Sequence, residues 1–447
     1  MNFLVKNHGK KKAKEIFYAR TDEYWKKEQK YSFLDESCAP TKILWEKVMS
    51  DAKHTWITKG LKDEYGDLLP LGTQEAKAGE GNAVFMSYSR GAETTRDVWV
   101  YNFDELSLQA NVESLIDVYN VEVDRWHNRT DKNANLDDFV LNDSRKIKWS
   151  SRLKECLMRN QYAAFEKKKI RKSLYRPYTS ELLFFDSILT HRQGQFPKIF
   201  PLRDANNSVI CMNGIGMSKP FHTIMVSVIP DVQFTPNGQC FPFYTYDEDG
   251  SNRKENITDW ALKEFRVHYN DKKITKWDIF YYVYGLLHHQ KYGENYQANL
   301  KRELPRIPFT PDFWGFSKAG KKLAELHANY EKQEEYPLEV IENKDEPLNW
   351  RVEKMKLSKD KTQLIYNNFL TLDGIPPDVF GYRLGNRSAL DWIVDQYQVK
   401  TDKRSGIVND PNREDEPDYI VKLIKKVVTI SLETNKIVRA LPALSVE

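Results

Sequence analysis

Hydrophobic residues change their spacing along this chain, and the changes predict where helices and strands lie. Apolar side chains recur at helical spacing in Leu106–Trp126 and Thr258–Tyr269, and the aromatic-rich stretch Ile274–Tyr330 continues the helical section. From Leu182 to Tyr246 the pattern changes to short apolar runs separated by Gly, Pro and Asn, which is typical of strands. This order of segments predicts an α+β (mixed α/β) fold, in which a mixed β-sheet region is flanked by helical bundle segments.

Shorter patterns fill in the rest of the chain. We expect strands at 182–189, 198–202, 208–214, 222–230, 240–246, Val84–Tyr88, Val98–Tyr101, Trp350–Leu357 and Gln363–Asn368, and helices at Thr21–Leu34, Ile147–Lys172, Ala389–Gln398 and Tyr419–Asn435. Near the N-terminus, Phe3–Val5 and Glu15–Tyr18 are expected as strands joined by a basic turn. A two-stranded hairpin is marginal by itself, so this pair is expected to join a larger sheet.

The length of the chain, 447 residues, exceeds what one ordinary core organises, so more than one subdomain is expected. The polar segment Asp131–Asp143 and the charged segment Glu331–Glu346 are the expected linkers. The predicted parts are residues 1–130, a β-rich part at 131–257, a helical part at 258–335 and a mixed C-terminal part at 347–447.

Net charge and cysteine usage exclude few functional classes of protein. Lys and Arg number 68 against 64 Asp and Glu, a formal charge of +4, which permits nucleic-acid binding without arguing for it. The four cysteines stand far apart, with no CxxC pair and no zinc-ligand spacing, as in a protein of a reducing compartment. No segment has the apolar length of a membrane span. We therefore expect a cytoplasmic protein.

Catalytic motifs are not recognisable in the sequence. A methyltransferase needs a glycine-rich turn for S-adenosylmethionine and a loop of the Asn-Pro-Pro-Tyr type for the flipped base, and neither occurs. The glycines of Asn213–Phe221 lie between expected strands and indicate a tight turn rather than a phosphate cradle. His288 and His289 are adjacent and lack the spacing of metal ligands. Asp395–Lys400 resembles a nuclease site only weakly. The chain is expected to perform no chemistry unaided and to hold no cofactor or metal.

Basic residues, by contrast, occur in clusters, several of them beside aromatic residues. Arginine offers a fork that matches phosphate or a guanine edge, and lysine tracks phosphates. A solvated helix face is the alternative for any single cluster. Cations interleaved with flat rings in Ile274–Tyr330 suit a surface that holds nucleic acid. The candidate DNA-binding residues are Arg90, Arg96, Lys172, Arg176, Lys301, Arg302, Arg306, Arg383, Arg387, Lys400, Lys403 and Arg404.

Several long blocks resemble a known family. Glu255–Arg266, Asp278–Tyr292, Asn299–Phe309, Phe313–Glu331 and Ser388–Arg413 are similar to the C-terminal specificity region of type ISP restriction–modification enzymes. Ser89–Phe103 and Tyr175–Asp186 resemble the segment that joins the methyltransferase to that region. The family carries a nuclease, a RecA-like translocase, a coupler, an N6-adenine methyltransferase and a target-recognition domain in one polypeptide. The resemblance implies that this chain is the end of the methyltransferase plus the recognition domain.

The resemblance also implies what the chain works with. The partners would be double-stranded DNA and the methyltransferase and nuclease–translocase domains, and S-adenosylmethionine, ATP and Mg²⁺ would be held only by domains absent from this chain. Arg90–Arg96 and Tyr175–Arg176 would lie near the methyltransferase junction, although packing or internal salt bridges are the alternative for both pairs. Two other hypotheses stay open: one subunit of a split DNA adenine methyltransferase, and an interaction scaffold or degenerate remnant that binds no DNA.

Overall fold

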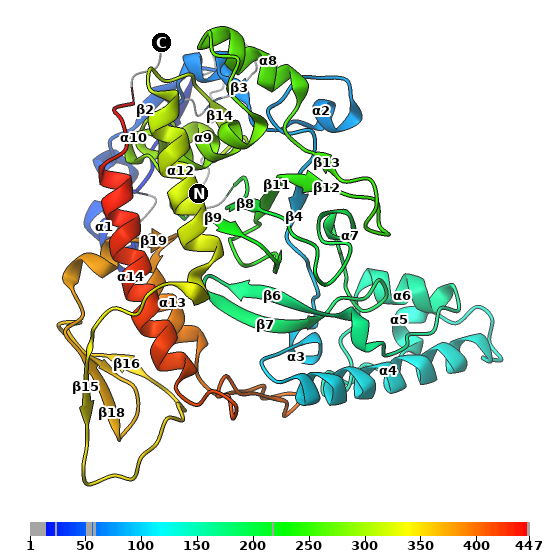
Figure 1. Ribbon diagram of the computed structural model, residues 1–447. Helices are drawn as coiled ribbons and strands as arrows, with labels where there is room; N and C mark the ends of the chain where they lie inside the picture. The colour runs from blue at the N-terminus through cyan, green and yellow to red at the C-terminus, as the bar shows by residue number, and fades with distance from the viewer. Residues whose placement is uncertain (1–14, 23–24, 51–55, 57–59, 217–218, 445–447) are drawn as a thin grey trace. The chain divides into compact units, whose positions relative to one another are not determined.

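The computed structural model describes residues 15–22, 25–50, 56, 60–216 and 219–444. The chain divides into two compact units, Met1–Asp63 and Glu64–Glu447, whose elements are labelled in Figure 1. The divisions predicted at residues 130, 257 and 335 fall inside the second unit and stay predictions.

The first unit holds a small antiparallel sheet. Its strands are β1 (Ile16–Tyr18) and β2 (Glu46–Val48), and between them in sequence lie α1 (Lys27–Ser37) and a 3₁₀ turn, Pro40–Lys42. The predicted strand at Glu15–Tyr18 is therefore confirmed, with β2 as its partner.

The first helix begins later than the predicted start at Thr21. The Gln29 side chain accepts a hydrogen bond from the Lys26 backbone N–H at 2.8 Å, which satisfies a donor that the helix leaves unpaired and stabilises a start at Lys27. The other predicted strand, Phe3–Val5, lies outside the described residues.

A mixed four-stranded sheet organises one part of the second unit. Its order is β10 (Ile229–Pro230), β6 (Ile170–Arg176), β7 (Thr179–Phe184) and β5 (Tyr101–Asn102), with β10 and β6 parallel and the other pairs antiparallel. The long helix α4 (Glu105–His127) packs on β5 and β7 and buries one apolar stripe. The prediction of a mixed sheet region is confirmed.

A second sheet is antiparallel, in the order β4 (Ser89–Arg90), β11 (Gln239–Pro242), β8 (Val209–Met212) and β9 (Thr223–Val226). Its buried side packs into a core shared with the helical section. The connection between β8 and β9, residues 213–222, joins antiparallel neighbours and contains a turn, as predicted from its glycines.

Two helices of the helical section approach each other closely. A Cβ at Gly320 of α12 (Phe313–Ala328) would lie 1.8 Å from the Tyr281 carbonyl oxygen of α9 (Lys276–Leu287). A Cβ at Gly285 would likewise lie 2.5 Å from the backbone of α12. Glycine at both positions lets the backbones pack, which positions the aromatic side chains of α9 in the core.

Several aromatic residues of this section lie in the core rather than on a binding surface. Phe280, Tyr282, Tyr284 and Tyr292 are fully buried. Stacking of bases requires exposed ring faces, so the predicted nucleic-acid surface of interleaved rings and cations is wrong for these residues. The hydrophobic area of these rings, three on α9 and one on α10 (Gln290–Asn295), fills the core instead.

The C-terminal part adds a third sheet and two helices. The sheet is antiparallel, in the order β15 (Glu339–Glu342), β18 (Leu370–Asp373), β17 (Leu364–Ile365) and β16 (Lys356–Leu357). α14 (Tyr419–Arg439) packs against α12 and against α13 (Ala389–Gln396). Figure 1 shows α14 running beside α12.

The remaining elements are short. The helices are α2 (Gln74–Ala78), α3 (Asp97–Val100), α5 (Leu136–Phe139), α6 (Ser151–Met158), α7 (Phe196–Ile199), α8 (Asp259–His268), α10 (Gln290–Asn295), α11 (Gln297–Leu300) and α13 (Ala389–Gln396), with 3₁₀ turns at Asp63–Asp67, Lys167–Lys169, Tyr330–Lys332 and Pro377–Gly381. The strands are β3 (Leu69–Pro70), β12 (Tyr244–Thr245), β13 (Lys254–Glu255), β14 (Arg306–Ile307), β19 (Arg383–Leu384), β20 (Arg387–Ser388), β21 (Lys400–Thr401) and β22 (Val408–Asn409).

Strong helical patterns were predicted well and weaker ones were not. Within the predicted helix Ile147–Lys172 only α6 is α-helical, because Asn160, with φ of 55°, turns the chain out of the helix. The 3₁₀ turn Lys167–Lys169 and the start of β6 at Ile170 follow. The predicted strand at 198–202 is replaced by α7, which has a proline in its first turn.

Two further strands and one linker need correction. Val84–Tyr88 forms an isolated bridge rather than a strand, and Val98–Val100 lies in α3, so that only Tyr101 begins a strand. The predicted linker Glu331–Glu346 contains β15, because its Val340 and Ile341 pair with β18. For Phe85 and for β15 a partner distant in the sequence decides the local structure.

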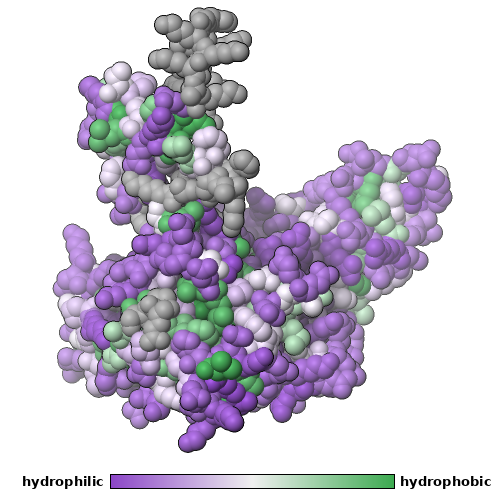
Figure 2. Space-filling view, turned by 90° about the horizontal axis from the view of Figure 1, so that it is seen from above, coloured by the Kyte–Doolittle hydropathy of each residue, from purple (hydrophilic) through white to green (hydrophobic). Residues whose placement is uncertain are grey.

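None of the helices in the described part of the chain is long and apolar enough to cross a membrane. Hydrophilic residues cover most of the face shown in Figure 2, with smaller apolar patches between them.

Candidate nucleic-acid interface

The described residues of the β8–β9 loop, 213–216 and 219–222, contact several of the predicted basic segments. The Gly216 N–H donates a hydrogen bond to the Lys301 carbonyl oxygen at 2.8 Å, which places the end of α11 beside the loop. A Cβ at Gly385, in the turn between β19 and β20, would lie 3.8 Å from the Lys219 side chain. The β19–β20 hairpin therefore contacts the same loop.

A third basic segment reaches this loop through Asn237. The Arg90 guanidinium donates to the Asn237 side-chain oxygen at 3.2 Å, and a Cβ at Gly214 would lie 2.2 Å from the Asn237 carbonyl oxygen. The structure thus gathers basic residues from four segments that are distant in sequence. We call them the loop cluster: Arg90, Lys219, Lys301, Arg302 and Arg383.

The two arginines of the β19–β20 hairpin have different surroundings. Arg383 is exposed, and its guanidinium donates to the Asn386 carbonyl oxygen of the same turn. Arg387 is half-buried; its guanidinium lies 2.7 Å from the Asp395 carboxylate and 4.9 Å from the centre of the Trp392 ring. Arg383 is therefore placed to meet an external ligand, whereas Arg387 holds the hairpin on α13.

A second basic region is the hairpin of β21 and β22. The Asp402 carboxylate accepts hydrogen bonds from the Arg404 N–H at 3.1 Å and the Ser405 N–H at 2.8 Å, and these bonds lower the pKa of Asp402. The turn is fixed internally, while Lys403 and Arg404 are exposed at its tip. We call Lys400, Lys403 and Arg404 the hairpin cluster.

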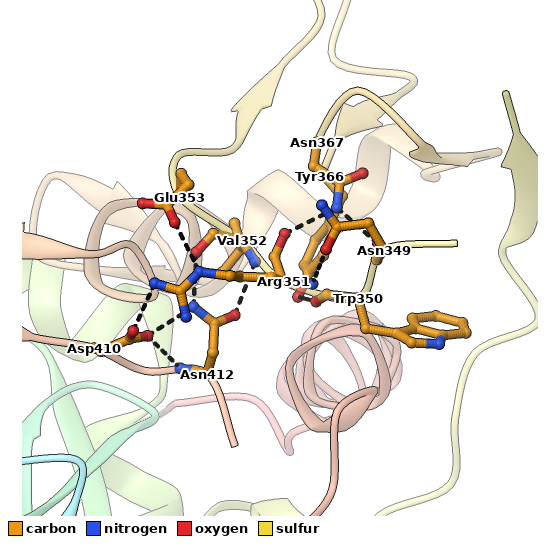
Figure 3. Close-up of polar contacts among 9 residues, drawn as sticks. All are labelled: Asn349, Trp350, Arg351, Val352, Glu353, Tyr366, Asn367, Asp410 and Asn412. Carbon is orange, nitrogen blue, oxygen red and sulfur yellow. Dashed lines mark hydrogen bonds and ion pairs between the residues drawn. The ribbon is translucent and has the colours of Figure 1, made fainter. Parts of the chain in front are cut away.

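The base of this hairpin is clamped by side-chain amides and one ion pair, shown in Figure 3. The Asn412 amide accepts from the Val352 N–H and donates to the Val352 carbonyl oxygen, both at 2.8 Å, so that a side chain imitates a strand partner. The Arg351 guanidinium lies 2.7 Å from the Asp410 carboxylate. These contacts hold the chain after β22 on the segment before β16, so the hairpin is presented from a rigid base.

A pocket of about 370 Å³ lies beneath the hairpin, where α3 and β5, the β6–β7 hairpin and β21–β22 meet. Arg176 lines it; the guanidinium forms an ion pair with buried Asp231 at 2.9 Å and covers the Tyr175 ring at 3.9 Å. Burial, and then the charge of Asp97, raise the pKa of Asp231 to about 7. Burial also raises the pKa of Glu181, another lining residue, to about 7.

Lys172 and Arg306 are engaged within the protein. The Lys172 ammonium pairs with the Glu331 carboxylate. The Arg306 guanidinium donates to the carbonyl oxygens of Gly66 and Leu68 at 3.0 and 3.1 Å. Each cation joins two segments of the chain that are distant in sequence. Contact of Lys172 and Arg306 with DNA stays a prediction.

Arg96 has the position of a packing residue. It is 1% exposed, and its guanidinium donates to the Leu189 carbonyl oxygen, to the Lys148 carbonyl oxygen at 3.3 Å and to Ser150 Oγ at 2.7 Å. Burial lowers its pKa to about 10. The alternative of packing therefore fits Arg96, and we remove it from the candidate interface as a correction, because DNA cannot reach a group enclosed in this way.

Sequence reasoning missed the acids and amides of these sites. Asp97, Glu181, Asp231, Asn409 and Asn412 come from separate segments, and no local spacing brings them together. The one usable signal was the Asp-Lys-Arg-Ser-Gly sequence at 402–406, whose residue types favour a tight turn.

Fold and site together define an α+β module that presents exposed basic turns from a hydrogen-bonded framework. The chain belongs to the family of the Type ISP C-terminal specificity domain, whose model matches residues 83–423. A comparison with the curated proteins found no significant match.

Three solved structures, two of them of Type ISP restriction-modification enzymes, are similar to this chain. A nuclease-deletion mutant of LlaGI, in complex with a DNA substrate mimic, is 33% identical with a TM-score of 0.82 over 95% of this chain. LlaBIII bound to DNA is 30% identical with a TM-score of 0.81 over 93%. A DrdV–DNA complex is 31% identical with a TM-score of 0.83 over 96%. This chain spans only 32%, 26% and 43% of those three chains.

Proposed function

We propose that this chain recognises a specific sequence in double-stranded DNA and supplies target choice to a restriction–modification system. The observation that carries the proposal is the family match across residues 83–423. The matched range includes every residue of both basic clusters and most of the framework that holds them. The similar enzymes LlaGI, LlaBIII and DrdV were each solved with DNA, which supports the same ligand for this chain.

In the two clusters, some side chains would bind phosphates and others would contact bases. Lysines and exposed arginines would neutralise phosphates, which supplies most of the affinity and makes it dependent on salt. Specificity would come from a few side chains that reach base edges, for which an arginine fork suits guanine. Arg383 is our candidate for contact with a base edge, because it is exposed.

The proposal is tested by a binding selection on randomised duplex DNA. We expect the selected pool to converge on one short sequence, bound more tightly than the starting pool at moderate salt. A pool that stays random after repeated rounds, although the protein is folded, would contradict sequence-specific recognition.

Methylation of adenine at N6 and restriction would be carried out by methyltransferase and nuclease–translocase domains outside this chain. We propose that S-adenosylmethionine, ATP and Mg²⁺ are bound there. Within the described residues no group of three or more His, Cys, Asp or Glu side chains is arranged to hold a metal ion. A cytoplasmic location, with access to DNA, belongs to the same proposal.

A second candidate is one subunit of a split DNA adenine methyltransferase. The observation that favours it is the partial span of this chain, at most 43% of the similar enzymes named above. Methyl transfer that appears only when a chain with the missing glycine-rich and Asn-Pro-Pro-Tyr loops is added would establish this candidate.

Replacing Lys301 and Arg302 together with alanine is expected to weaken duplex binding and to reduce the slope of log K against log salt by about one to two. Both residues lie where the loop cluster meets α11. Titrations at several salt concentrations measure the slope. An unchanged slope would remove this pair from the DNA surface.

Replacing Arg383 with alanine is expected to relax the preference at one base position, with a cost of about 1–3 kcal/mol for the preferred base. Selection with the variant measures this change position by position. Arg145→Ala, at an exposed arginine paired with Asp143, is the matched control and should leave the selected sequence unchanged. A uniform loss of affinity in R383A, with the same sequence preference, would assign Arg383 to phosphate instead.

A further inference from the structure

Two of the four cysteines come together in the antiparallel sheet that carries the loop cluster. Cys211 lies in β8 and Cys240 in β11, and the two residues are directly paired in the register of these strands. Their Sγ atoms are 3.5 Å apart, and the side chains are 0% and 1% exposed. Both are free thiols. The fold therefore forms a dithiol from residues that stand 29 positions apart in the chain.

The backbone geometry of the pair suits a disulfide bond. Residues directly opposite each other in antiparallel strands have Cα atoms about 4.5–5.5 Å apart and project their side chains to one face of the sheet. A disulfide requires Cα atoms about 4.4–6.8 Å apart and an S–S bond of about 2.05 Å. The strands can therefore stay in register while the two sulfur atoms approach each other by about 1.5 Å.

Neither neighbour of the pair in this row of the sheet is a thiol. Cys240 is paired on its other side with Ser89 of β4, and Cys211 with Ile224 of β9. Burial, and then a hydrogen bond with Cys240, raise the pKa of Cys211 well above its ordinary value, so the reactive thiolate is scarce. Oxidation of the pair then depends on local opening of the sheet, which makes it slow.

The pair lies next to contacts that hold the loop cluster. Asn213, the residue after β8, accepts a hydrogen bond from the His222 N–H at 2.9 Å through its side-chain oxygen. Asn237, two residues before β11, accepts from the Arg90 guanidinium at 3.2 Å. A covalent bond between β8 and β11 would therefore fix the strands from which both of these contacts are made.

We propose that Cys211 and Cys240 are a redox-sensitive pair, which a peroxide converts into a cross-strand disulfide that joins β8 covalently to β11. One thiolate attacks the O–O bond of hydrogen peroxide, which gives a sulfenic acid and releases hydroxide. The second thiol then attacks the sulfenic sulfur, the S–S bond forms, and the sulfenic oxygen leaves as water. The two sulfur atoms lose two electrons, one peroxide is reduced to two waters, and a thiol reductant reverses the change.

The experiment uses the full chain with Cys38→Ser, which removes the exposed thiol. The native protein is treated with hydrogen peroxide, remaining thiols are blocked with N-ethylmaleimide in denaturant, and unreduced digests are analysed by mass spectrometry. We expect a linked pair of peptides that contain Cys211 and Cys240, accumulating over hours because the thiols are buried. Dithiothreitol should return both thiols. Cys156, a buried thiol of α6 outside the pair, is the internal control and should be recovered in the blocked form.

Urea unfolding measures whether the bond stabilises the sheet. A disulfide that closes a loop of about 30 residues restricts the unfolded chain, so the urea midpoint of the oxidised protein should rise by about 0.5–1 M and fall back after reduction. The same peroxide treatment of Cys240→Ser should give neither the linked peptides nor the rise in midpoint.

Three results would overturn the proposal. They are recovery of Cys211 and Cys240 as blocked thiols after prolonged treatment, their conversion to sulfinic or sulfonic acids without a linked pair, and a linked pair that leaves the urea midpoint unchanged or lowers it. Should C240S not fold, the reduced and oxidised forms of the C38S chain decide alone, because they differ only in the state of their sulfur atoms. None of these measurements requires DNA, so the outcome is independent of the proposed function.

Discussion

Replacing Tyr284 with phenylalanine is expected to lower the free energy of unfolding by about 2–4 kcal/mol, although the change removes a single oxygen atom. The Tyr284 hydroxyl accepts from the Met225 N–H at 2.7 Å and donates to His327 Nδ1 at 2.6 Å, and His327 Nε2 lies 2.9 Å from Thr434 Oγ1. All of these groups are buried. The chain of bonds joins β9, α9, α12 and α14 through the core.

The size of the effect follows from what the substitution leaves behind. Burial lowers the pKa of His327 well below its ordinary range, so the ring stays neutral. The Tyr284 hydroxyl already accepts from the Met225 N–H, so its own hydrogen is available to His327 Nδ1, and the ring then carries its proton on Nε2, toward Thr434. Without the Tyr284 hydroxyl, His327 Nδ1 and the Met225 N–H are both unpaired away from water. An unsatisfied buried group costs about 1–3 kcal/mol, far more than a hydrogen bond between exposed groups contributes.

Urea unfolding at neutral pH measures the difference, with the slope against denaturant as a check that the unfolded state is unchanged. Tyr162→Phe is the matched control: this tyrosine is 49% exposed and its hydroxyl donates to Asp124 at 2.6 Å. Its loss should cost less than about 0.5 kcal/mol. Similar losses in Y284F and Y162F would show that the buried bonds do not hold the helical section on the sheet.

The extent to which the fold could be predicted depended on how strongly each segment determines its own structure. Leu106–Trp126 was predicted as a helix because its apolar stripe is long, and Asp104 caps it by accepting from the Ser107 N–H at 2.7 Å. The segment at Glu339–Glu342 has mixed polarity and four exposed residues, and its strand exists only because β18 offers a partner. Pairing with a distant strand leaves no local trace.

The candidate site shows the same limit. Clusters of arginine and lysine could be found from the sequence. Whether each side chain is exposed and able to contact DNA could not. Arg96 and Arg383 are both arginines near aromatic residues, yet one is enclosed by three acceptors and the other is exposed on a turn. The buried acids opposite Arg176, which give the pocket its chemistry, come from β7 and from the chain after β10, and only the fold brings them together.

Replacing Glu181 with glutamine is expected to stabilise the protein at pH 8 and to leave its stability at pH 4 nearly unchanged. Burial is the main cause that raises the pKa of Glu181 from its ordinary 4.5 to about 7. Below pH 4.5 the carboxyl is protonated in both states, so the folded state is not penalised there. Between pH 4.5 and about 7 the unfolded state releases this proton while the folded state retains it, so stability falls as the pH rises and levels off above about pH 7.

At about 1.4 kcal/mol per pH unit, the interval between 4.5 and about 7 corresponds to about 3 kcal/mol that E181Q should recover at pH 8. Glutamine keeps a side-chain oxygen for the Asn409 amide, so the hairpin contact survives. Thermal unfolding from pH 4 to pH 8 measures the difference, with exposed Glu334→Gln as the control that should show no such trend. A variant that is less stable than the wild type at pH 8 would mean that ionised Glu181 is stabilised by Arg176 and Lys400, whose charges then outweigh the cost of burial.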